Sequence, residues 1–206
     1  MSRLSENPVA PMSAAQAATR AEFSREQRRV LLAIARASIA STLIGQPLPD
    51  SPPASPSPFP ALIEPRGVFT TLYLEGKLRG CVGYPLPTHP LFLAVAETAR
   101  AAAFEDSRFW PLTPEETPRL QISLSVLSPL FPVGAGEVEV GRHGLLISQG
   151  LRRGLLLPQV PIEHGWDRET FLEQTCRKAG LPLDAWRKSA ALEAFTAEVF
   201  GDEDGT

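Results

Sequence analysis

Apolar and polar residues alternate strictly along positions 120–126 of the chain. Every second position is apolar, and the apolar set is Leu120, Ile122, Leu124 and Val126. The intervening positions are polar: Gln121, Ser123 and Ser125. Side chains in a strand point alternately to its two faces, so this period of two predicts a strand with one buried and one polar face.

Helical spacing of apolar residues predicts a helix after Ser24. Ser24 and Gln27 form a capping box, in which each side chain bonds the backbone N–H of the other residue. Gly45 and Pro47 mark the end of the helix. The residues expected to face the core follow at helical spacing: Val30, Leu31, Ile34, Ala37 and Ser38.

Two further helices are predicted later in the chain. Pro90 stands where a first helical residue is expected, and an apolar face follows it at Leu91, Phe92, Val95, Ala99 and Ala103. Asp167 caps a third helix that ends at Gly180. Cys176 lies on this helix and is expected in the core.

Strand-like runs that pair across short turns predict two hairpins. Residues 68–74 and 78–82 flank one turn, and residues 144–149 and 154–157 flank another. The remaining predicted elements are a short strand at 138–140, a helical turn at 184–188 and a last strand at 193–200. Hairpins with interspersed helices predict an α+β fold with a mainly antiparallel sheet and flanking helices.

The N-terminal third of the chain predicts the domain layout. Residues 1–22 are small, polar and rich in alanine, and we expect them to be frayed or disordered. Residues 23–206 are expected to form the domain. Seven prolines between positions 47 and 60 predict an extended connector at 46–60, with a ligand for a proline-recognising partner as the alternative.

Composition narrows the classes of function. The chain has 206 residues, 43% of them hydrophobic, and a formal net charge of −3, which disfavours binding to a nucleic-acid backbone. No apolar run is long enough for a membrane span, and a cytoplasmic protein is expected. The two cysteines and three histidines lack paired ligand spacing, so no metal is predicted, and no motif for a cofactor is present.

The segment Leu78–Gly83 holds a thiol and a guanidinium close to two glycines. Gly80 and Gly83 predict a tight turn around Cys81 with exposed amides that can bind a ligand. Arg79 favours the thiolate and is a candidate anchor for a carboxylate or phosphate. Cys81 is then the nucleophile or thiol ligand, and the alternative is a small buried hydrophobic residue.

Other candidate site residues lie far along the chain. His143, between glycines, is a candidate base for Cys81. Glu163 could orient an imidazole, and Trp166 could line the site. The loop 105–111 offers an acid, a base and two aromatic residues. We expect Phe109 and Trp110 to pack the loop onto the core and Asp106 to pair locally with Arg108, and this is favoured over a ligand role.

Several segments together resemble the AMMECR domain family. They are Gly67–Leu72, Leu78–Gly83, Ala101–Phe109, Ile122–Ser128, Gly141–Gly144, Leu157–Val160, Gly165–Trp166 and Phe171–Leu181. The resemblance runs from about Ser24 to Phe200 and departs from the family at Val82, at Tyr84 and in the proline-rich insertion. It implies a larger and a smaller subdomain with a groove between them, near Arg79, Cys81 and His143.

The resemblance also implies companions. Bacterial members are similar to the A component of the AmmeMemoRadiSam set, whose other components are a Memo-type protein and a radical-SAM enzyme. Two classes of function stay open: an enzyme or substrate-presenting subunit that holds a small molecule at Cys81, and a non-catalytic module that binds a nucleotide, peptide or protein. The reactivity of Cys81 distinguishes them.

Overall fold

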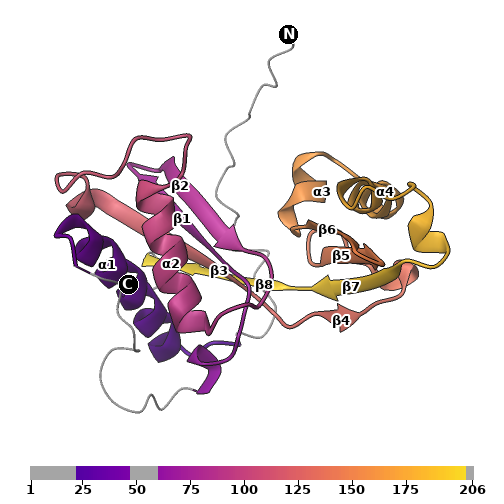
Figure 1. Cartoon of the computed structure of the whole chain (residues 1–206), viewed down its shortest axis with the longest axis horizontal. Coiled ribbons are helices and arrows are strands. Elements are labelled where there is room, and N and C mark those ends of the chain that lie inside the picture. Colours follow the sequence, from indigo (N-terminus) through magenta and orange to yellow (C-terminus); the bar gives the residue numbers. More distant parts are fainter. Residues whose placement is uncertain (1–21, 47–59, 203–206) are drawn as a thin grey trace, which may run out of the picture. The chain divides into compact units, whose positions relative to one another are not determined.

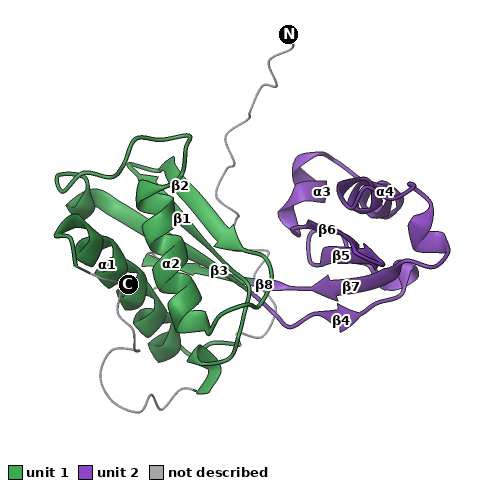
Figure 2. Ribbon diagram, in the orientation of Figure 1, with its two compact units in different colours: residues 1–126, 198–206 green, residues 127–197 purple. Residues whose placement is uncertain are grey.

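The computed structural model describes residues 22–46 and 60–202, which fold into two compact units (Figures 1 and 2). The larger unit comprises Met1–Val126 and Glu198–Thr206, and the smaller unit comprises Leu127–Ala197. Each has its own antiparallel sheet and helices, which confirms the predicted α+β class. The predictions for residues 1–22 and for the connector 46–60 fall almost entirely outside the described residues.

The sheet of the larger unit has the strand order β2-β1-β3-β8. Its strands are β1 (Val68–Leu74), β2 (Lys77–Tyr84), β3 (Leu120–Leu127) and β8 (Ala197–Gly201). The helices α1 (Arg25–Leu43) and α2 (Leu91–Phe104) lie on one side of this sheet (Figure 2). The four apolar residues predicted on one face of β3 are all buried in this core.

The first helix begins as its sequence predicts. The Ser24 hydroxyl accepts from the Gln27 amide at 3.2 Å, and the Gln27 side chain accepts from the Ser24 amide at 2.7 Å. Leu31, Ile34 and Ser38 are buried as expected. Ala37 is exposed instead, because the buried stripe runs through the neighbouring helical positions Ala35 and Ile39.

The hairpin of β1 and β2 has a two-residue turn. Glu75 and Gly76 both have positive φ, 53° and 75°, as a type I′ turn requires. Leu72 pairs with Gly80 and Tyr73 with Leu78, so Arg79 is an extra residue in β2. Such a β-bulge changes the direction in which a side chain points, and here it affects the predicted site.

The smaller unit has the strand order β4-β7-β5-β6. The strands are β4 (Phe131–Pro132), β5 (Gly144–Gln149), β6 (Arg152–Leu156) and β7 (Ala191–Phe195). A short helix α3 (Gln159–Glu163) precedes α4 (Arg168–Lys178), whose cap at Asp167 and end at Gly180 agree with the prediction. Cys176 on α4 is fully buried, as expected.

Two strand predictions are wrong. Residues 138–140 form no strand; Val138 follows a short 3-10 helix, Ala135–Glu137, and is buried. The expected single strand 193–200 is two strands, β7 and β8, which belong to different sheets. Phe195 and Phe200 are both buried although they are five positions apart, a spacing that places residues on opposite faces of one strand. The chain therefore changes sheets between them.

Among the described residues, no helix is long and apolar enough to cross a membrane.

Candidate functional site

Cys81 lies in the middle of strand β2, which is an edge strand of the larger sheet. The predicted tight turn at this point is therefore wrong. Gly80 and Gly83 continue the strand, and neither has a positive φ. Their role is to permit close approach: a Cβ at Gly80 would lie 2.1 Å from the Ala102 carbonyl oxygen of α2, and one at Gly83 would lie 2.2 Å from the Phe69 ring.

The register of the sheet places three polar side chains in one row. Thr71 of β1 pairs with Cys81 of β2 on one side and with Ser123 of β3 on the other. The Thr71 hydroxyl is 3.4 Å from the Cys81 Sγ atom and is placed to donate to it. We call Cys81, Thr71 and Ser123 the hydroxyl–thiol row. All three residues are half-buried.

The row lies on the face of the sheet opposite to the helices. The preceding residue Thr70 points the other way, where its hydroxyl lies 2.8 Å from that of Thr98 on α2. Side chains alternate between faces along a strand, so Thr71 and its neighbours in the row point away from α2. Neither α1 nor α2 lies on this face (Figure 2).

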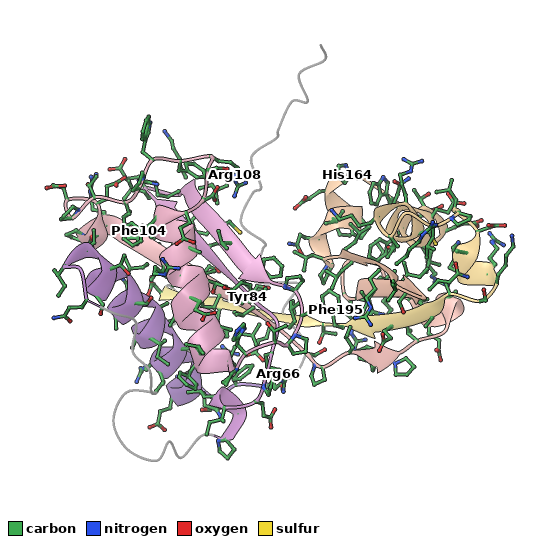
Figure 3. All side chains as sticks on the ribbon, in the orientation of Figure 1. Arg66, Tyr84, Phe104, Arg108, His164 and Phe195 are labelled. Carbon is green, nitrogen blue, oxygen red and sulfur yellow. The ribbon has the colours of Figure 1, made fainter. Side chains whose placement is uncertain are left out.

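The outer edge of β2 is closed at Cys81 by two side chains of the following loop. The Cys81 amide donates to Asp106 Oδ2 at 2.9 Å. Nη2 of Arg108, a residue labelled in Figure 3, donates to the Cys81 carbonyl at 3.4 Å. Arg108 also binds Asp106 through Nε at 3.0 Å and through Nη2 at 2.8 Å. A carboxylate and a guanidinium thus replace the partners that another strand would supply to Cys81.

The Asp106 carboxylate is ionised in the folded protein under ordinary conditions. Its side chain is only 6% exposed, yet the hydrogen bond from Arg108 lowers the pKa of Asp106 from 3.8 to about 2, helped by the amides of Cys81 and Arg108. Because the pKa is depressed on folding, Asp106 stabilises the fold above pH 3.8, and this contribution is lost as the pH falls toward 2.

We therefore expect Asp106→Asn to destabilise the protein at pH 7 and to lose most of that effect in acid. The difference in free energy of unfolding between the two proteins should shrink steadily between pH 4 and pH 2. Urea denaturation at several pH values measures it. A difference that stays constant over this range would mean that the Asp106 charge does not support the fold.

Arg79 is bound by a carboxylate of its own chain. Its Nε and Nη2 atoms donate to the two Glu116 carboxylate oxygens at 2.8 and 3.0 Å, and the side chains are 13% and 19% exposed. The hydrogen bonds from Arg79 lower the pKa of Glu116. Nη1 is buried without a hydrogen-bond partner in the described parts of the chain. The expected contact of Arg79 with a ligand stays a prediction.

The remaining predicted site residues belong to the smaller unit. His143 is buried, which lowers its pKa, and its Nδ1 atom accepts from the Glu139 amide at 3.1 Å. Glu163 is exposed at the end of α3. Trp166 stacks on His164 with ring centroids 4.6 Å apart. The structure thus brings Arg79, Cys81 and the two glycines together on β2, and the proposed pairing of Cys81 with His143 stays a prediction.

Sequence reasoning missed two members of the row, Thr71 and Ser123. The alternation at 120–126 already assigned Ser123 to the polar face, but only the pairing of β1 with both neighbours makes it part of a site. The local pairing of Asp106 with Arg108 was foreseen, whereas its attachment to Cys81 was not. The expectation that Trp110 packs on the core is wrong, because its side chain is 88% exposed.

The geometry defines a two-unit α+β protein with a bulged edge strand at the centre of its candidate site. The AMMECR1 family model matches residues 32–200. The chain belongs to this family.

Relatives and a solved structure agree with this assignment. A protein of Thermococcus gammatolerans is 48% identical over 156 residues, covering 70% of this chain and 76% of the relative. One from Methanothermobacter thermautotrophicus is 42% identical over 196 residues, covering 90% and 98%. The crystal structure of the uncharacterized protein PH0010 from Pyrococcus horikoshii matches with a TM-score of 0.65 and 41% identity, over 84% of this chain and 90% of that one.

Proposed function

We propose that this protein is a binding subunit that holds a small polar molecule at the hydroxyl–thiol row. The observation that carries the proposal is the register Cys81–Thr71–Ser123, which aligns a thiol and two hydroxyls across three adjacent strands. Strands hold side chains at fixed spacing, so the donors and acceptors of the row are preorganised for a ligand.

The chemistry of the row favours an uncharged polar ligand. The row itself contains no carboxylate or cation, and the charged side chains bound to β2 at this point are already paired: Asp106 with Arg108, and Arg79 with Glu116. Hydroxyl groups donate and accept, whereas a free thiol is a weak donor. A carbonyl or hydroxyl group on the ligand could form hydrogen bonds with the row, and neither the ligand nor the row would carry a charge that lacks a partner.

Binding can be tested with the complete set of small metabolites extracted from the source organism. Native mass spectrometry of the full chain should detect a bound molecule, and Ser123→Ala and Thr71→Val should each reduce its occupancy at least about fivefold. Ser107→Ala, which removes an exposed hydroxyl outside the row, is the control. Equal occupancy in all four proteins would reject the row as the site.

A second function is favoured by the Thr71 hydroxyl beside Cys81, namely that the thiol adds to an electrophilic double bond of its ligand. The sulfur then bonds to carbon as the π bond breaks, the thiol proton passes to the other atom of that double bond, and no group leaves. The hydrogen bond from the Thr71 hydroxyl to the sulfur, at 3.4 Å, holds the thiol in a fixed position beside the groups that would bind the ligand. The same subunit could then present a substrate as a thiol adduct. This function requires Cys81 to be reactive in the folded protein.

Iodoacetamide should therefore modify Cys81 at least about tenfold faster than Cys176 in the folded protein near neutral pH. Cys81 is half-buried, whereas Cys176 is fully buried and burial raises its pKa. Peptide mapping after timed alkylation measures both rates. Thr71→Val should slow only Cys81 if the hydroxyl positions the thiol. Equally slow modification of both thiols would leave non-covalent binding as the function.

The binding subunit is proposed to work with a Memo-type protein and a radical-SAM enzyme. This part of the proposal rests on the family resemblance and on the side chains that β2 contributes to the candidate site, which include a thiol but no general base. The companions encoded by the same organism should co-purify with the full chain, at least after chemical crosslinking. Absence of both under these conditions would restrict the proposal to ligand binding alone.

A further inference from the structure

Two adjacent aromatic residues in the loop after α2 have opposite environments. Phe109 is half-buried, with the guanidinium carbons of Arg79 and Arg108 at 6.0 and 5.6 Å from its ring centre. Trp110, the next residue, is 88% exposed. Folded proteins seldom expose a complete tryptophan, whereas protein interfaces are enriched in this residue. The exposure of Trp110 therefore needs an explanation.

The loop that carries Trp110 is fixed to the body on both sides. Before it, Asp106 binds the Cys81 amide, and the Phe109 amide donates to the Asp106 carbonyl at 3.0 Å. After it, the Leu112 amide donates to the Ala103 carbonyl at 2.8 Å, and the Leu112 side chain is buried. Little conformational freedom remains to be lost when the indole is covered, which favours its use as a preorganised anchor.

The charged residues of the same loop select the kind of partner. Glu105, Asp106 and Glu116 are each paired with an arginine of this chain. Glu115, five positions after Trp110, is exposed; hydrogen bonds from its own amide and from the Thr113 side chain lower its pKa, and no arginine or lysine of the described residues forms an ion pair with it. An anionic lipid surface would repel this carboxylate, whereas a lysine or arginine of a protein would pair with it. A projecting indole fits a concave surface.

We infer that Trp110 anchors the docking of a protein partner that has an apolar socket with a lysine or arginine on its rim. The indole enters the socket, and the cation faces Glu115. The docking surface therefore comprises Trp110, Pro111 and Glu115. It lies on the loop that also binds the backbone of Cys81 through Asp106 and Arg108. This inference goes beyond the binding of a small molecule at the row and does not depend on it.

Photo-crosslinking of the full chain tests the inference. A benzoylphenylalanine replaces Trp110 in one protein and Leu151 in a control; Leu151 is a fully exposed apolar residue in the turn between β5 and β6. Each protein is irradiated in a soluble extract of the source organism, and the crosslinked peptides are sequenced. We expect position 110, and not position 151, to capture a peptide with apolar residues and a nearby lysine or arginine.

The captured protein is then purified and its affinity is measured. Trp110→Ala should weaken binding at least about tenfold, Trp110→Phe should retain most of it, and Leu151→Ala should leave it unchanged. Glu115→Lys should also weaken it, more strongly at low salt. The inference is overturned if position 110 captures nothing beyond position 151, captures only a second copy of this chain or lipid, or if Trp110→Ala binds as the unsubstituted protein does.

Discussion

Gly80→Val should unfold or severely destabilise the larger unit, at a cost of about 3 kcal/mol or more. A Cβ at this position would lie 2.1 Å from the carbonyl oxygen of Ala102, and that oxygen belongs to the backbone of α2. A side chain could rotate away, but a helix backbone cannot move without disturbing the packing of α2 on β1 and β2. Thermal or urea unfolding, monitored by circular dichroism, measures the effect.

Two other glycine variants distinguish the clash with the α2 backbone from the general cost of replacing a glycine. The atoms nearest to a Cβ at Gly83 belong to the Phe69 ring, at 2.2 Å, and to the Val68 carbonyl, at 2.7 Å, which is farther than the 2.1 Å from a Cβ at Gly80 to the Ala102 carbonyl oxygen, so Gly83→Ala should cost less than Gly80→Ala. Gly136 is exposed, its φ is not positive, and a Cβ added to it would meet nothing within 4 Å. Gly136→Ala should change stability by no more than about 0.5 kcal/mol. A Gly80→Val protein as stable as Gly136→Ala would mean that β2 and α2 do not approach as described.

Arg79→Ala should destabilise the protein by about 3 kcal/mol at pH 7. It leaves the Glu116 carboxylate, which is 19% exposed, without the two hydrogen bonds that now hold it. Glu116 also accepts from the Thr113 amide at 2.9 Å, so the segment before β3 should loosen as well. Urea unfolding at pH 7 measures the loss, and limited proteolysis within residues 105–119 should become faster.

The effect of Arg79→Ala should also depend on pH. The hydrogen bonds from Arg79 lower the pKa of Glu116 below its usual 4.5, so the pair stabilises the fold above that pH and loses its effect as the carboxylate is protonated below it. The difference between the two proteins should therefore narrow in acid. Arg119→Ala is the matched control, because its pair with Glu75 is more than half exposed and contributes about 0.5 kcal/mol at most.

Local rules predicted most of the elements, because their signals lie within a few residues. The capping box at Ser24, the caps at Asp167 and Gly180 and the alternation at 120–126 each describe interactions that a single segment makes with itself. The division of residues 193–200 between two sheets was not predicted, because it depends on which core each phenylalanine enters. Only the spacing of Phe195 and Phe200 indicated it.

The candidate site was predicted by residue type but not by geometry. The glycines beside Cys81 suggested a turn, since glycine permits positive φ, yet here glycine permits a helix and an aromatic ring to approach a strand. Sequence cannot distinguish these two uses of glycine at a single position. The partner of Arg79 lies 37 residues away at Glu116, and pairing over such a distance is decided by the fold.

The crossing of the chain between the two sheets has a mechanical consequence. The chain leaves the larger sheet after β3 and returns to it in β8, which is the neighbour of β3. At the crossing, the Ser128 amide donates to the Thr196 carbonyl at 2.9 Å and the Thr196 amide donates to the Ser128 hydroxyl at 3.0 Å. A pulling force applied at residues 22 and 202 would therefore pass through α1 and β8 of the larger unit. The smaller unit, as an insertion with adjoining ends, would carry that force only after β8 had detached from β3.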